Sequence, residues 1–182
     1  MATSRLVEAE AVLPAAARTP APSVDVYGAH EFWESALCAV ATAKKTVFCT
    51  GLVYDNPKLQ AKLLASRARG VSVEVLVDKL SFQEGTAKYA RRRLETLKDK
   101  GARVYLCSGK SYKSVFGVAG QPGNYHAKVL VVDGEVAFAG SSNPTANSLV
   151  NGEVVLKVAG PATVATKVVK TAWAEAKRVE AL

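Results

Sequence analysis

The sequence has 182 residues, enough for one domain with a substantial core and too few for two comfortable ones. Its hydrophobic fraction of 49% and charged fraction of 22% are typical of a globular protein, and no apolar run approaches the roughly 18 residues that span a bilayer. The net charge of +8 favours polyanionic partners, either nucleic acid or an acidic membrane surface, with a merely solubilising surface charge as the alternative.

The cysteines and the N-terminus bear on the cellular compartment. Three cysteines without close spacing argue against a disulfide framework and against a zinc site, and favour a reducing compartment such as the cytoplasm. Glu8 and Glu10 interrupt the N-terminus, so a secretory signal is not expected, whereas its Ala-rich, Arg-containing stretch leaves organellar import open. We expect residues 1–23 to form a short helix, an arm and a linker, and residues 24–182 to form the folded domain.

Strand and helix patterns alternate through the first half of this domain. Asn56-Pro57 predicts a helix start, with Asn56 as the N-cap and Pro57 in the first turn. In chain order the patterns predict a strand at 24–27, a helix at 30–43, a strand at 46–54, a helix at 56–69, a strand at 71–77, a helix at 86–100 and a strand at 102–107. This order indicates an α/β fold with βαβ crossovers and a central mixed, mostly parallel sheet flanked by helices on both faces.

A polar, glycine-rich segment at residues 108–123 interrupts the alternation. It is long for a plain connection, and loops of this kind often carry function. Beyond it the sequence predicts strands at 125–132 and 135–139 joined by a two-residue Asp-Gly hairpin, a cap and short turn at Asn143-Pro144, a strand at 153–158 and a final helix at 162–180.

The predicted hairpin carries a set of polar residues suited to phosphate chemistry. His126 and Lys128 are two residues apart, so on a strand their side chains point the same way, about 7 Å apart. Gly140, Ser141 and Asn143 follow in a small loop. Attack on a phosphate ester needs an imidazole that acts as nucleophile or proton carrier, a fixed positive charge and neutral hydrogen-bond donors.

The full spacing, H-x-K-x4-D-x6-G-S-x-N, resembles the motif of the phospholipase D superfamily, on His126, Lys128, Asp133, Gly140, Ser141 and Asn143. The resemblance implies a phospholipase D-like catalytic domain and the activity of a small, single-motif, endonuclease-like phosphodiesterase. In that family the His attacks phosphorus and forms a phosphohistidine, so no metal or other cofactor is implied. The family pattern assigns Lys128 to the phosphate charge, and Asn143 with Ser141 to the phosphate and to orientation of the site.

Three further assignments accompany the motif. Asp133 comes five residues after Lys128, so its side chain lies on the opposite face of the strand or within the hairpin turn, and we expect it to hold the Asp-Gly turn. Gly140 permits close approach of the backbone. Glu153 falls near where the family often places a carboxylate that holds the catalytic imidazole, with an exposed strand acid as the alternative. Before the motif lie two cations and two aromatic residues, Lys110, Tyr112, Lys113 and Phe116. They are suited to binding a nucleic-acid strand, with burial of the aromatic rings under the loop as the alternative.

The motif occurs only once, although in-line attack by one imidazole needs a second group to protonate the leaving oxygen and to activate water. The other histidine, His30, lacks motif partners and is expected at the surface. Single-motif members of the resembled family pair two chains, which implies a homodimer with the active site on its two-fold axis. The nuclease is the preferred function, acting on DNA or RNA; the alternatives are a hydrolase of anionic, cardiolipin-type phospholipid and a non-catalytic nucleic-acid-binding module.

Overall fold

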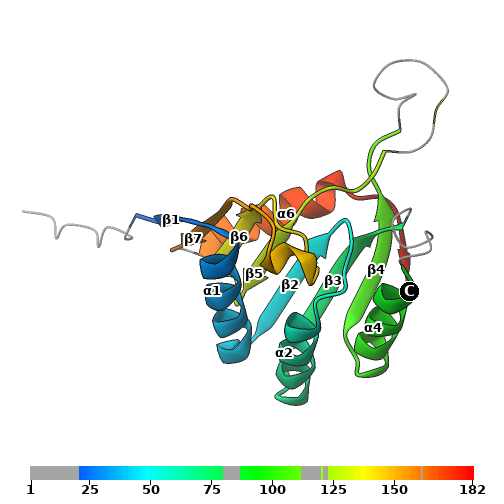
Figure 1. Cartoon of the computed structure of the whole chain (residues 1–182), viewed down its shortest axis with the longest axis horizontal. Coiled ribbons are helices and arrows are strands. Elements are labelled where there is room, and N and C mark those ends of the chain that lie inside the picture. Colours follow the sequence, from blue (N-terminus) through cyan, green and yellow to red (C-terminus); the bar gives the residue numbers. More distant parts are fainter. Residues whose placement is uncertain (1–20, 80–86, 112–119, 121–122, 161) are drawn as a thin grey trace, which may run out of the picture.

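An eight-stranded sheet forms the centre of the computed structural model, which describes residues 21–79, 87–111, 120, 123–160 and 162–182 (Figure 1). The strand order is β1-β7-β6-β5-β2-β3-β4-β8. The strands are β1 (Ser23–Tyr27), β2 (Thr46–Gly51), β3 (Ser72–Asp78), β4 (Arg103–Ser108), β5 (Val129–Val132), β6 (Val136–Gly140), β7 (Val155–Ala159) and β8 (Lys177–Ala181). The helices are α1 (Ala29–Thr42), α2 (Pro57–Ala68), α4 (Ala87–Asp99) and α6 (Ala162–Glu175), with a 3-10 turn η1 (Asn147–Leu149).

The strands β2, β3 and β4 are parallel, which confirms the predicted crossovers. The helix α2 lies between β2 and β3 in the chain and begins as expected. The Asn56 side chain accepts the N–H groups of Lys58 and Leu59 at 2.9 and 3.0 Å, and Pro57 occupies the first turn. The cap satisfies two donors that the first helical turn leaves without a partner.

All other strand pairs are antiparallel, namely β1–β7, β7–β6, β6–β5, β5–β2 and β4–β8. The predicted mixed sheet is therefore confirmed, whereas the expectation of a mostly parallel sheet holds only for the pairing of β2 with β3 and of β3 with β4. The connections account for part of this: a three-residue loop joins β5 to β6, which only antiparallel strands allow, and residues 141–154 between β6 and β7 contain the 3-10 turn η1 but no α-helix to form a crossover.

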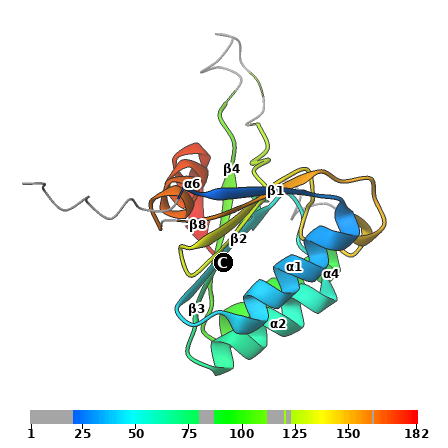
Figure 2. The same cartoon turned by 90° about the vertical axis from the view of Figure 1, so that its left-hand side faces the viewer.

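Helices cover both faces of the sheet, as predicted. Figure 2 shows α1, α2 and α4 on one face and α6 on the other. The larger core lies under the group of three helices and includes Trp33, Leu63 and Leu94. The smaller core lies under α6 and includes Phe48 and Val131.

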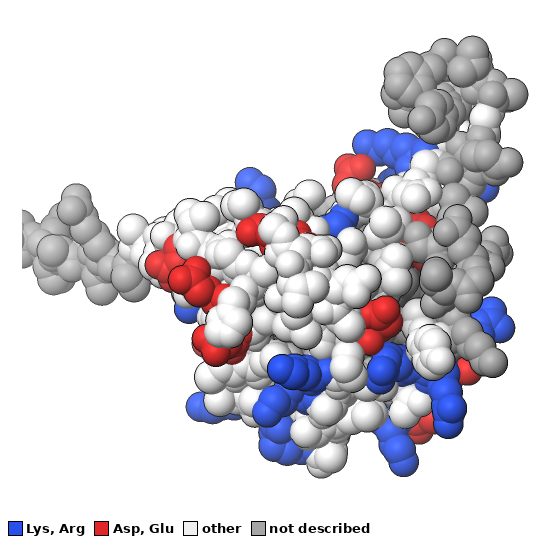
Figure 3. Space-filling model, viewed as in Figure 1, with Lys and Arg blue, Asp and Glu red and all other residues white. Residues whose placement is uncertain are grey.

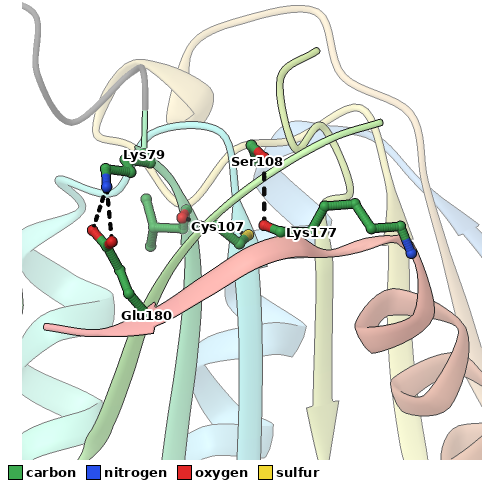
Figure 4. A network of polar contacts seen from close by, with 6 residues as sticks. Lys79, Cys107, Ser108, Lys177 and Glu180 are labelled. Atoms are coloured by element: carbon green, nitrogen blue, oxygen red, sulfur yellow. Dashed lines mark hydrogen bonds and ion pairs between the residues drawn. The ribbon is translucent and has the colours of Figure 1, made fainter. Parts of the chain in front are cut away.

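The C-terminal segment is a helix followed by a strand, so the prediction of one helix through residue 180 is wrong. Helix α6 ends at Glu175, and β8 pairs with β4 at the edge of the sheet. Figure 4 shows two contacts that fasten β8: Glu180 lies 2.7 Å from the Lys79 ammonium, and the Ser108 hydroxyl donates to the Lys177 carbonyl at 3.4 Å. Without β8, the edge of β4 would expose unpaired N–H and C=O groups, and pairing with them favours a strand over a helix at residues 177–181.

The β5–β6 hairpin has a three-residue loop, one residue longer than predicted. Val132 pairs with Val136 across the hairpin. Asp133 and Gly134 both adopt positive φ, 55° and 70°, and the Glu135 N–H donates to the Val132 carbonyl at 3.0 Å. The expected Asp-Gly turn therefore forms, and Glu135 is the additional residue.

Some predictions fall outside the described residues. These are the N-terminal helix and arm, apart from the last few residues before β1, and the side chains of Tyr112, Lys113 and Phe116. Of the helices that are described, none has the length and apolar character required to cross a membrane.

Candidate active site

His126 lies in an unpaired segment that leads into β5, although the sequence predicted a strand from Tyr125 onward. Side chains of neighbouring strands bind this backbone in place of a ladder partner. The Asp78 carboxylate accepts the N–H of Tyr125 at 2.5 Å, and the Thr50 hydroxyl donates to the carbonyl of Ala127 at 2.9 Å. The residues on both sides of His126 are therefore held from β3 and β2.

The surroundings of this segment are buried, while the imidazole is not. Asp78 is 0% exposed and Tyr125 is 1% exposed. The Tyr125 hydroxyl donates to the Ala172 carbonyl of α6 at 3.0 Å. His126 is exposed, and none of the described residues forms a hydrogen bond with its ring. An accessible ring on a fixed backbone suits a group that must meet an incoming substrate.

An open pocket of about 310 Å³ contains His126, together with Lys110 and Glu175. The Lys110 ammonium lies 3.1 Å from a carboxylate oxygen of Glu175, and both side chains are about half exposed. The structure thus brings one of the four residues predicted to bind substrate, Lys110, to the pocket of His126, and pairs it there with an acid.

Lys128 turns into the protein and is only 8% exposed. Its ammonium donates to the main-chain carbonyl of His126 at 2.9 Å, and the side chain lines a cavity of about 20 Å³ beside Gly140. Burial lowers the pKa of Lys128 below its ordinary value, and the charge of Glu153 partly offsets this effect. A cation in such a desolvated position exerts a stronger field than one in water.

Ser141 and Glu153 are in direct contact, because the Ser141 hydroxyl donates to the Glu153 carboxylate. The same hydroxyl accepts the N–H of Val154 at 3.0 Å. Glu153 therefore lies beside Ser141 and close enough to affect Lys128, but the described hydrogen bonds do not link it to the imidazole of His126, as the family pattern implied.

Gly140 makes the close backbone approach expected of it. A Cβ atom at this position would stand 2.3 Å from the carbonyl oxygen of Val154 and 2.7 Å from the Cα atom of Val155. Any side chain at residue 140 would therefore push β7 away from the loop that carries Ser141.

Asn143 joins the same loop to the end of β2. Its side-chain oxygen accepts the N–H of Leu52 at 3.1 Å, and the next carbonyl, that of Pro144, accepts the N–H groups of Asp55 and Asn56 at 2.9 and 3.1 Å. The predicted cap at Asn143 is wrong, because the 3-10 turn η1 begins only four residues later. With its oxygen engaged, Asn143 offers its amide NH₂ as the donor.

Asp133 lies beyond the opposite end of β5 from Lys128. Its carboxylate accepts three main-chain N–H groups, of Lys44, Lys45 and Thr46, at 2.9, 2.7 and 2.9 Å. Burial alone would raise the pKa of Asp133, but these hydrogen bonds and the charge of Lys45 lower it below its ordinary value. Asp133 thus ties the hairpin to the start of β2 and does not join the other motif residues.

Sequence reasoning missed Thr50 and Asp78, which hold the backbone around His126. Asp78 carried a usable signal, since it is an acid directly after an apolar strand, and the carboxyl ends of parallel strands are where sites form. Thr50 carried no such signal, because threonine is common in strands.

The motif residues supply an accessible imidazole, a desolvated ammonium, an amide and a hydroxyl held by a carboxylate. Such a set can bind and attack a phosphate ester. Within the described ranges, no three His, Cys, Asp or Glu side chains are grouped closely enough to hold a metal ion.

Comparison with known proteins gives matches over most of the chain. The protein family described as Cardiolipin synthase, PLD-like domain, matches residues 37–176. Cardiolipin synthase A of Pseudomonas fluorescens is 33% identical over an alignment of 98 residues, which covers 50% of this chain and 19% of that protein. The chain therefore spans about a fifth of this relative's length.

Two solved structures share the fold. Nuc from Salmonella typhimurium, a phospholipase D family member, has a TM-score of 0.68 at 19% identity, covering 86% of this chain and 97% of that one. NucT from Helicobacter pylori has a TM-score of 0.73 at 18% identity, covering 85% and 96%. At these identities the likeness concerns the fold.

Proposed function

We propose that the chain, which belongs to the phospholipase D superfamily, is an endonuclease that cleaves DNA or RNA phosphodiesters through a covalent histidine intermediate. The superfamily membership makes it a phosphodiesterase in general, and nucleic acid is our proposal for the substrate. The observation that carries the proposal is the accessible His126 on a backbone bonded to the buried ammonium of Lys128.

In the proposed reaction a ring nitrogen of His126 attacks phosphorus. A P–N bond forms while the bond to the leaving oxygen breaks, and that oxygen takes the electron pair and a proton from a second imidazole. Water then attacks the phosphohistidine, the second imidazole takes a proton from this water, and the P–N bond breaks to release the product and free His126. These two steps need no metal ion, because the imidazole itself is the nucleophile.

The remaining site residues handle charge. We assign Lys128 to the negative charge of the phosphate, with the Asn143 amide and the Ser141 hydroxyl as neutral donors. Glu153 positions the Ser141 hydroxyl, which donates a hydrogen bond to its carboxylate. Its negative charge also favours the protonated form of Lys128, because it raises the pKa of that lysine. Lys110 would contact a flanking phosphate after leaving Glu175.

A second copy of the chain would supply the second imidazole. His30, the other histidine, is 82% exposed and lies 3.7 Å from Glu34 within α1, which favours a surface role. We therefore propose a homodimer in which two copies of His126 meet at the two-fold axis. Sedimentation equilibrium is the direct check: an active protein that remains monomeric at assay concentration would contradict this part of the mechanism.

A phospholipid hydrolase is the second candidate, because one observation favours it. An apolar groove of about 340 Å³, with Val129 and Val168 in its wall, shares Ala127 and Glu175 with the pocket of His126. Such a groove suits an acyl chain whose phosphate lies at His126. The net charge of +8 is compatible with anionic lipid but favours a longer polyanion.

One experiment separates the candidates. The protein is incubated in EDTA with single-stranded DNA, duplex DNA, RNA and cardiolipin vesicles, beside His126→Ala and the matched control His30→Ala. We expect cleavage of nucleic acid that is abolished by His126→Ala and retained by His30→Ala. Turnover of lipid alone would contradict the nuclease, and binding of nucleic acid without any turnover would favour a non-catalytic binding module.

A further inference from the structure

A second cationic surface lies at the end of the sheet away from His126. The strands β2, β3 and β4 are parallel, so the three loops that precede them meet at one edge. We call this surface the basic pole and define it by its exposed cations, which are Lys44, Lys45, Arg69, Lys98, Lys100 and Arg103. Figure 3 shows Lys and Arg side chains gathered over the lower end of the molecule, where Figure 1 places the ends of α1, α2 and α4.

The three loops of the basic pole are bonded to one another. The Ser72 N–H donates to the Lys45 carbonyl at 2.9 Å, which joins the first loop to the second. The Arg67 side chain donates to the Lys100 carbonyl at 3.4 Å, and Arg103 donates to the Ser72 hydroxyl at 3.4 Å, which joins the second loop to the third. The cations therefore belong to one continuous, rigidly held surface.

Few acids balance these cations. Glu74 forms an ion pair with Arg103 at 2.9 Å, the Asp133 carboxylate is occupied by three main-chain N–H groups, and Asp99 lies at the end of α4. The exposed Glu135 lies in the same hairpin loop as Asp133. With Arg67 included, seven cations face these four acids, a net charge of +3 where the whole chain carries +8. More than a third of the excess charge is thus concentrated at this end of the sheet.

Helix dipoles account for only part of this surface. Cations in the last turn of a helix complement its partial negative charge, and Arg67 and Lys98 occupy such positions. Lys45, Lys100 and Arg103 lie beyond the helix ends, and α1 has no basic residue in its last turn. An exposed surface of this density is suited to a chain of phosphates.

We propose that the basic pole binds the phosphate backbone of nucleic acid at a place separate from the pocket of His126. The six residues of β2 put about 20 Å between the basic pole and the pocket of His126. A phosphate bound at the pole is therefore not the phosphate that His126 attacks. Held there, nucleic acid stays at high local concentration around the enzyme. The inference concerns binding, and it stands whether or not the pocket of His126 cleaves nucleic acid.

A nucleic acid fits this surface better than a membrane does. Proteins that bind lipid surfaces usually combine cations with apolar side chains that enter the interface. Among the described residues, the large apolar side chains that are exposed lie elsewhere, at Val24, Val26, Tyr89, Val150, Val154, Leu156 and Val179. The pole offers charge alone, which is the requirement for sequence-independent backbone contacts.

The test measures binding of a fluorescent DNA duplex in EDTA, with all variants made in His126→Ala protein so that nothing is cleaved. The pole variant carries Lys45→Gln and Lys100→Gln. The matched control carries Lys58→Gln and Lys170→Gln, two exposed lysines in the first turn of α2 and on α6. Both variants lose the same charge, and thermal melting checks that both remain folded.

We expect the pole variant to bind the duplex about tenfold to a hundredfold more weakly, and the slope of log K against log salt to fall by about 2, as for two lost phosphate contacts. The control should stay within about twofold of the parent. Equal effects in the two variants would overturn the proposal. So would a pole variant that keeps its affinity for the duplex but loses binding to phosphatidylserine vesicles, because the partner would then be a membrane.

Discussion

The ammonium of Lys128 and the main-chain carbonyl of His126 are joined by a hydrogen bond of 2.9 Å. The side chain proposed to bind phosphate therefore also holds the backbone of the residue proposed to attack it. Thr50 and Asp78 bind the backbone of the two neighbouring residues, Ala127 and Tyr125, so the position of the imidazole depends on the strands β2 and β3. In the proposed mechanism, one lysine therefore couples the binding of substrate charge to the position of the nucleophile.

Replacing Lys128 by Met should separate catalysis from stability. We expect turnover to fall by about 10³-fold or more, because the charge opposite the phosphate is lost. The free energy of unfolding should change by less than about 2 kcal/mol, since removal of a desolvated ammonium offsets the lost hydrogen bond. Steady-state kinetics and urea melts measure the two quantities, and full activity in the variant would refute the role given to Lys128.

Replacing Glu153 by Gln should shift the pH dependence of turnover. Burial lowers the pKa of Lys128, and the Glu153 charge raises it, so loss of that charge lowers the pKa further. Turnover needs the protonated lysine and is lost as pH rises through its pKa. The alkaline limb of a pH–rate profile should therefore move to lower pH; an unmoved or upward-shifted limb argues against the coupling.

Replacing Asp133 by Asn should destabilise the protein without touching the site. Asn tolerates the positive φ of this turn but lacks the charge that three N–H groups bind. We expect a loss of about 1–2 kcal/mol near neutral pH. Because the pKa of Asp133 is lowered by folding, its contribution is present above the unfolded-state value and is lost as pH falls through the folded-state value.

The difference between wild type and Asp133→Asn in urea melts should therefore shrink in acid. Asp99→Asn, at the exposed end of α4, is the control and should behave like the wild type at each pH. A difference that is independent of pH would show that the charge of Asp133 is not the stabilising feature.

Replacing Gly140 by Ala should disturb the loop that carries Ser141. The new Cβ atom would stand 2.3 Å from the Val154 carbonyl oxygen, so β7 must move, and we expect a cost of about 1–3 kcal/mol with a loss of turnover. Gly152→Ala is the matched control, because nothing lies within 4 Å of its Cβ position. Similar melting temperatures for the two variants would contradict the close approach as the reason for glycine.

Local patterns were sufficient for the order and type of the elements up to β4, although the strand predicted at 46–54 ends at Gly51. They failed at β8, because a strand that forms on the open edge of β4 leaves no periodic signal in its own residues. They also failed at Tyr125, where Asp78 and Thr50 bind the backbone in place of a ladder partner and β5 begins only at Val129. Both errors concern contacts with residues far away in the sequence.

The candidate site shows the same division. The motif spacing predicts that His126, Lys128, Ser141 and Asn143 act as one group, and this stays a prediction. The spacing did not reveal that Lys128 points inward, or that Glu153 binds Ser141 and not the imidazole, since both depend on the tertiary packing around these residues.

In the proposed mechanism, His126 forms a covalent bond to the substrate phosphorus. The most direct measurement is transfer of ³²P from an internally labelled oligonucleotide to the protein, quenched with alkaline denaturant and resolved on a gel, for wild type and His126→Asn. We predict a labelled band in the wild type that maps to His126, and neither band nor cleavage in the variant. Cleavage that persists in His126→Asn, or label attached to another residue, would show that His126 is not the nucleophile.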